Sequence, residues 1–234
     1  MNKLIAVGLL AICGSAFAQD AGTQERLNDL KTKILEIAIE NGDNRNNLVE
    51  IRRELEPLVA EISEFQPTVD ATEELDQLVG SWKEVWSDDI EPEPPGFTTD
   101  RDGVYQVISS EGYFYNIGEL DGPLGFTATG YLRGVYRDAG INLAIEFTDV
   151  GVQLRGVDRV GSLVQKVEDI ESGASNLLPI PGNATAPNGP IGATGLLRNL
   201  YIDDEIRIAT GSNDADGVQD LYVLTRVVGP VRYR

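Results

Sequence analysis

The chain has 234 residues, 41% of them hydrophobic and 24% charged, which is enough for one sizeable soluble domain. It contains 38 acidic and 19 basic residues and no histidine, and its single cysteine and single methionine are Cys13 and Met1. Beyond Cys13, this composition excludes disulfides, thiolate chemistry, histidine-based zinc sites and Ser-His-Asp catalysis. The acidic excess disfavours nucleic acid as a partner, and we expect no cofactor and no bound metal.

The first residues have the pattern of a secretory signal peptide. Lys3 precedes an apolar run over residues 4–13, and residues 16–18 form a small-x-small cleavage site. We therefore predict a signal peptide over residues 1–18, a mature chain that begins at Gln19, and a periplasmic or secreted protein. The apolar run is too short to span a membrane. Attachment of a lipid to Cys13 stays open as the alternative to simple cleavage.

Residues 19–77 are predicted to form a helical segment that packs on the domain that follows. Apolar side chains recur at helical spacing along two stretches within residues 23–65. They are Leu27, Leu30, Ile34 and Ile37 in the first stretch, and Leu48, Ile51, Leu55, Leu58, Ile62 and Phe65 in the second. Asp43 or Asn44 is the expected cap of the second helix, and Pro57 is expected to kink or split it. The apolar stripe favours a packed cover, with a lid or a partner-binding hairpin as the alternative.

Residues 78–234 are predicted to form a β-barrel. A short helix begins with the capping box at residues 70–73, and after it the apolar pattern changes to a period of two. Residues 141–148 alternate as a strand. Residues 126–136 alternate large and small side chains, which suits the tapered interior of a small barrel.

The aromatic side chains of these strands are the candidate ligand-binding residues. Residues 81–87 are the expected first strand, with Trp82 and Trp86 on the same inner side, one closing the barrel end and the other lining the interior. An apolar pocket with few polar groups suits a small hydrophobic ligand, whereas a filled core would leave no room for one. The candidates are Trp82, Trp86, Tyr105, Tyr113, Tyr115, Phe126, Tyr131, Tyr136 and Phe147.

Two further segments lack a clear periodic pattern. Residues 172–195 form a long stretch rich in Gly, Pro, Ala and Asn, which could close over a cavity mouth or simply be flexible. Residues 212–220 resemble a calcium-binding loop, but Ser212 stands where the first Asp should be and Val223 where the closing Glu should be. A hairpin turn is therefore favoured there.

Four stretches together carry a resemblance to a known family. They are LVGSWKEVWSD at 78–88, GVYQVI at 103–108, LYIDDEIRIATG at 200–211 and DLYVLTR at 220–226. Their order and spacing resemble those of the plastid lipid-associated protein family, also called PAP/fibrillin, over residues 25–228. The resemblance implies a mainly β fold: a lipocalin-like antiparallel β-barrel preceded by a helical hairpin. It also implies a hydrophobic cavity associated with lipids, carotenoids or prenyl quinones.

The resemblance also marks a set of structural motif residues. They are Gly80, Tyr201, Asp203, Glu205, Arg207, Gly211 and Arg226. Strand alternation predicts Asp203, Glu205 and Arg207 as an ion-pair strip on one surface face, with Ile202, Ile206 and Ile208 on the other face. Arg226 is expected to stack on Trp82 and cap the closed barrel end.

Three features depart from the family pattern. The chain carries a bacterial-type export signal, the segment 172–195 is enlarged, and Glu84 stands where the family usually has an apolar residue. If Glu84 faces inward, its charge needs a partner, and Arg226 or Arg207 could serve.

The expected function is non-catalytic binding or carriage of a hydrophobic small molecule, such as a lipid, quinone or isoprenoid. The alternative is a structural or interaction protein with a filled barrel that docks a protein partner; empty space beside Trp86 would discriminate between the two. An enzyme that works through carboxylates alone would need two inward acidic groups, and Glu84 is the one inward candidate. A peripheral contact with a membrane also stays open.

Overall fold

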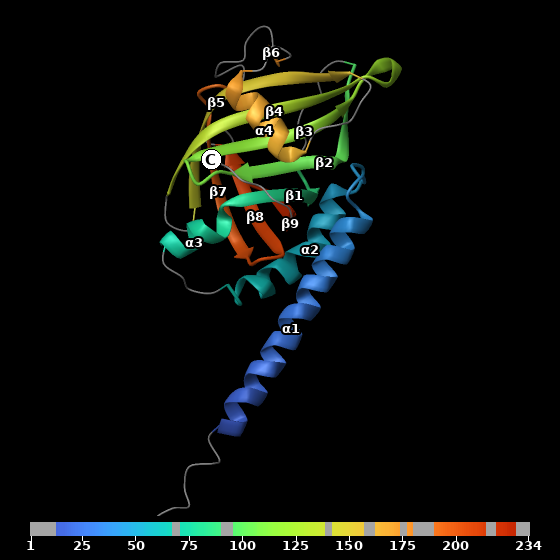
Figure 1. Cartoon of the computed structure of the whole chain (residues 1–234). Coiled ribbons are helices and arrows are strands. Elements are labelled where there is room, and N and C mark those ends of the chain that lie inside the picture. Colours follow the sequence, from blue (N-terminus) through green and yellow to red (C-terminus); the bar gives the residue numbers. More distant parts are fainter. Residues whose placement is uncertain are drawn as a thin grey trace, which may run out of the picture.

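Eight strands form a closed antiparallel barrel, which confirms the predicted fold class (Figure 1). The computed structural model describes residues 13–66, 71–89, 96–138, 142–156, 162–173, 177–179, 190–213 and 219–227. The barrel strands are β1 Gly80–Ser87, β2 Thr98–Ile108, β3 Tyr113–Asp121, β4 Thr127–Asp138, β5 Asn142–Gly156, β7 Thr194–Ile202, β8 Ile206–Asn213 and β9 Gln219–Arg226.

The strands follow one another around the ring as a meander. Each barrel strand pairs with the next, and β1 pairs with both β2 and β9, so that the ring closes. The long strand β5 pairs with β4 along its length, with β7 through its first half, and with the short strand β6 (Leu177–Pro179) through its second half. Closure leaves the eight strands without an open edge between first and last.

Two helices, α1 (Cys13–Glu40) and α2 (Leu48–Ser63), form the expected hairpin against the outside of the barrel (Figure 1). Their buried side chains form one cluster with outward-facing residues of β1, β7, β8 and β9, such as Trp86 and Ile208. The hairpin is therefore a packed cover, as predicted. Two details differ: the residue that precedes α2 is Asn47, not Asp43 or Asn44, and α2 runs through Pro57 without being split.

Two shorter helices complete the described structure. The predicted short helix is α3 (Ala71–Leu78), while its expected cap at position 70 lies outside the described residues. Helix α4 (Leu163–Ser172) was not predicted, although Ser162 caps it by accepting a hydrogen bond from the amide of Gln165, and Gly173 ends it in a left-handed conformation (φ 63°). None of the helices in the described ranges is long and apolar enough to cross a membrane.

Buried side chains gather in three clusters, one inside the barrel and two outside it. The first cluster joins α3 to residues of β1, β3, β7 and β9. Because these strands are not all neighbours in the ring, their side chains meet through the barrel interior. The second lies under α1 and α2. The third lies between α4 and the outer face of β2, β3 and β4. Both faces of the barrel wall are therefore covered over much of its surface.

The two loop predictions fall partly outside the described residues. Within the segment 172–195, residues 177–179 form β6, whereas residues 174–176 and 180–189 are not described. In the segment 212–220, Ser212 pairs with Gln219, which confirms a β8–β9 hairpin whose tip is not described.

Candidate functional site

A β-bulge in β1 separates the two tryptophans. Trp82 lies opposite Gln106 and Arg226, but the register with β9 shifts between Glu84 and Trp86, so that Trp86 lies opposite Val223. One extra residue in a strand reverses the alternation that follows it. Trp82 therefore packs inside the barrel and Trp86 packs outside it, under the helical hairpin. The prediction that both face inward is wrong for Trp86, and space beside it cannot discriminate between the functions.

Four of the predicted lining tyrosines also lie on the outer face. Tyr105, Tyr113, Tyr115 and Tyr131 pack in the cluster under α4. Tyr115 donates a 2.8 Å hydrogen bond from its hydroxyl to Glu171 of that helix. Their predicted interior position is wrong because α4 provides a second apolar environment outside the wall, so an apolar strand face need not point inward.

The remaining aromatic candidates divide between the interior and a turn. Tyr136 and Phe147 pack with Trp82 in the interior cluster. Phe126 lies in the turn between β3 and β4, just before β4 begins, and is 51% exposed. Three of the nine candidates thus lie inside the barrel.

One end of the interior is closed by helix α3 and two stacked side chains. The indole of Trp82 donates a 2.9 Å hydrogen bond to the carbonyl of Leu78 in α3. The Arg226 guanidinium lies 4.2 Å from the centre of the Trp82 ring and donates to the carbonyls of Gln77 and Val79. The predicted cation–π contact at the closed end is confirmed, and it holds α3 over that end.

Arg207 is fully buried inside the barrel, with 0% of its surface exposed. Its Nε donates to Asn199 Oδ1 at 2.8 Å, and its Nη1 donates across the interior to Gln106 Oε1 at 3.0 Å. Burial, reinforced by the like charge of Arg226, lowers the pKa of Arg207 to about 9. The prediction of a surface ion-pair strip is wrong for this residue.

The turn between β7 and β8 explains that error. Residues 203–205 are the turn itself, so Ile202 pairs with Arg207 and the alternation starts again at Ile206. Ile202 consequently packs inside the barrel, whereas Ile206 packs outside it, under the helices. The predicted grouping of the isoleucines on a single face is therefore wrong.

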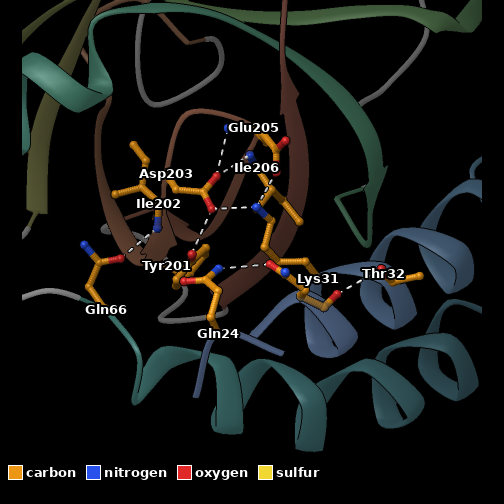
Figure 2. Close-up of polar contacts among 10 residues, drawn as sticks. Gln24, Lys31, Thr32, Gln66, Tyr201, Ile202, Asp203, Glu205 and Ile206 are labelled. Atoms are coloured by element: carbon orange, nitrogen blue, oxygen red, sulfur yellow. Dashed lines mark hydrogen bonds and ion pairs between the residues drawn. The ribbon is translucent and has the colours of Figure 1, made fainter. Parts of the chain in front are cut away.

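Asp203 fastens this turn to helix α1 (Figure 2). Its Oδ1 accepts hydrogen bonds from the amides of Glu205 and Ile206 at 2.8 and 2.9 Å. Its Oδ2 accepts from the Tyr201 hydroxyl at 2.8 Å and from Lys31 Nζ at 2.8 Å. Lys31 also pairs with Glu205. These contacts are structural, because they join the hairpin turn to the helix on the outside of the barrel.

The other half of the interior is lined by small and aliphatic residues of β2 to β5. Cross-strand pairs share a face, and the interior residue Gln106 pairs with Asn116. Two interior rows follow by pairing, Gln106–Asn116–Leu132–Val150 and Val104–Gly118–Gly130–Val152. A Cβ added at Gly118 would meet no atom of the described chain within 4 Å, so there is room beside the interior surface here.

Glu84 lies on the β1 side of this interior. Its Oε1 accepts a 2.7 Å hydrogen bond from the Ser87 hydroxyl. Burial raises the pKa of Glu84 and favours its neutral form. The expected partners are engaged elsewhere, Arg207 with two side-chain amides and Arg226 with backbone carbonyls. The predicted Glu84–arginine pair is therefore wrong, and the hydrogen-bond partner of Glu84 is Ser87.

Comparison with protein families agrees with this architecture. The PAP/fibrillin family model matches residues 28–218 of the chain. The chain belongs to the PAP/fibrillin family. The match covers the helical hairpin and the barrel as far as the tip of the last hairpin, close to the predicted extent of 25–228. A search of curated proteins found no match.

Proposed function

We propose that this PAP/fibrillin protein binds a hydrophobic small molecule, a lipid, quinone or isoprenoid, inside its barrel without chemically changing it. The observation that carries the proposal is the space beside Gly118 on an interior face that Leu132, Val150 and Val152 also line. Burying apolar ligand surface there would be favourable by roughly 25 cal/mol per Å². A preformed, mostly apolar enclosure is the usual form of such a site.

The interior chemistry supports binding more than catalysis. A mechanism based on carboxylates needs two such groups at the reacting atoms. Glu84 is hydrogen-bonded to Ser87, and burial raises its pKa so that the neutral form is favoured. A single carboxyl that is hydrogen-bonded within the wall suits a lining residue better than a paired acid and base.

Loading from a membrane would fit the turn between β3 and β4. Leu124 in this turn is 92% exposed and has a left-handed backbone (φ 59°), and Phe126 beside it is 51% exposed. Exposed apolar side chains at a loop tip can enter the headgroup region of a neutral lipid surface. We propose this turn as the peripheral membrane contact, and an exported location as the setting in which the protein works.

The two tryptophans allow a direct test of binding inside the barrel. We would prepare Trp86→Phe, which keeps the interior Trp82, and Trp82→Phe, which keeps the exterior Trp86, and add lipids brominated along the chain. Bromine quenches indole fluorescence at short range, so interior binding predicts stronger quenching in Trp86→Phe. Mass spectrometry of a solvent extract of the native protein would identify the cargo.

The opposite results would favour the alternative function. An empty extract, together with equal or no quenching of the two variants, would mean that the barrel is filled. The protein would then act through its outer surface, and a search for a protein partner would follow.

A further inference from the structure

We propose that Arg207 and Asn199 bind the carboxylate head of a long-chain amphiphile inside the barrel. This inference rests on the proposed function and names its ligand class: an anionic amphiphile that enters head first, not a neutral lipid. It assigns a binding role to Arg207. The family resemblance had suggested only a structural role for this residue.

These two buried side chains have unused hydrogen-bonding capacity. Arg207 is 0% exposed and Asn199 is 7% exposed. Neither Arg207 Nη2 nor Asn199 Nδ2 has a hydrogen-bond partner among the described residues. The Nε–Oδ1 hydrogen bond joins the two side chains and fixes which atom of the amide is the oxygen. Buried donors without partners are costly, and a carboxylate accepts from several donors at once.

The positive charge of Arg207 has no counter-charge among the described side chains that contact it. The charged group that acts on Arg207 is Arg226, which has the same sign. Glu84 shares an interior row with Arg207, with Leu224 between them, but its hydrogen bond runs to Ser87. A buried cation is normally paired with an anion, but Arg207 makes no ion pair among the described residues, and the Trp82 ring, 5.9 Å from its guanidinium carbon, is a weaker partner.

The interior next to Arg207 offers a route for an apolar tail. Arg207 donates to Gln106, which begins the interior row that continues through Asn116 to Leu132 and Val150. The neighbouring row contains Gly118, where space is available. A head group at Arg207 would thus direct its chain from the buried polar centre along aliphatic side chains. A guanidinium binds the oxygens of carboxylates and phosphates alike, and the two unused donors here, Arg207 Nη2 and Asn199 Nδ2, equal in number the two oxygens of a carboxylate.

The test compares two ligands that differ only in the head group. Binding of dodecanoate and of 1-dodecanol to the full mature protein would be measured at neutral pH by calorimetry, below the concentration at which dodecanoate forms micelles. We expect wild type to favour dodecanoate by at least about tenfold, the scale of a charge-assisted hydrogen bond. Arg207→Gln should lose this preference while still binding dodecanol, and Arg207→Lys should keep part of it. Arg198→Gln, at an exposed position on β7, is the matched control and should behave as wild type.

Each other outcome has a defined meaning. Equal binding of the two ligands by wild type would overturn the carboxylate site but leave the barrel as a binder, and this result needs no variant. Retention of the preference in Arg207→Gln would also overturn the assignment. If wild type binds neither ligand, both this inference and the proposed function fail. If dodecyl phosphate binds more tightly than dodecanoate, the site recognises phosphate and the carboxylate assignment is wrong.

Discussion

Glu84 shows how one carboxyl in the barrel wall can make stability depend on pH. Burial raises its pKa, so the folded state binds the proton more tightly than the unfolded chain does. The contribution of protonated Glu84 to the free energy of unfolding is therefore fully present below the ordinary pKa of glutamate. It is lost as the pH rises through the higher pKa of the folded state.

The substitution Glu84→Gln should remove the loss of stability that wild type suffers as the pH rises. We expect the variant to be more stable than wild type by about 1–3 kcal/mol at neutral pH, the scale of the desolvation penalty of a buried polar group. The difference should disappear well below the ordinary glutamate pKa. Urea unfolding at several pH values would measure it, with the exposed Glu111→Gln as control. A constant difference at all pH values would mean that the pKa of Glu84 is the same in the folded and the unfolded state.

Asp203 acts at the scale of elements, because it joins the β7–β8 turn to helix α1. Burial opposes ionisation of this carboxyl, but hydrogen bonds from Lys31, two backbone amides and Tyr201 outweigh it and lower the pKa of Asp203. The stabilisation that ionised Asp203 gives to the folded state is present above the ordinary aspartate pKa. It is lost as the pH falls through the lower pKa that Asp203 has in the folded state.

We expect Asp203→Ala to cost about 2–4 kcal/mol at neutral pH, because two amides lose their cap and Lys31 loses one of its two partners. The cost should shrink in acid. Chemical unfolding at neutral and at acidic pH would measure it. The neighbouring exposed residue gives a matched variant, Asp204→Ala, which should stay within about 0.5 kcal/mol of wild type. Equal effects of the two variants would show that the link to α1 adds no stability.

At the scale of the whole molecule, the packed part of the helical hairpin belongs to the fold, whereas the chain up to residue 18, which includes the first residues of α1, is expected to be removed. The packed side chains of α1 begin near Leu27, well after the predicted cleavage site at residues 16–18. Removal of Lys3 leaves 18 basic and 38 acidic residues, a net charge of −20. Such a charge would help to keep the proposed lipid carrier in solution and disfavours contact with anionic surfaces.

We therefore expect the exported protein to begin at Gln19 and to unfold at the same denaturant concentration as the full chain. The intact mass of the protein from its native compartment checks the first point, and urea unfolding of both forms checks the second. A mass that includes a lipid on Cys13, with the protein in the membrane fraction, would contradict simple cleavage. A Cys13→Ala variant that stays exported and soluble would support it.

Periodicity and turn signals were enough to predict most of the elements and their order along the chain. The helical hairpin, the closed barrel, the β8–β9 hairpin and the Arg226–Trp82 stack are all present. These features follow from patterns along short stretches: a period near 3.6 or 2, and turn residues between them. The family resemblance supplied the closure of the strands into a barrel. Helix α4 was missed, although Ser162 and Gly173 are recognisable end signals.

The side of the wall that each strand face occupies was decided only by the tertiary structure. A period of two shows which residues share a face, but here the interior and the helix-covered exterior both accept apolar side chains, so composition does not identify the inner face. The bulge before Trp86 and the turn before Ile206 each reverse the pattern through backbone geometry that no residue type announces. The same reversal brings Arg207 into the interior. The sequence by itself therefore determined most of the elements and the family, and the closed barrel determined which side chains face the interior.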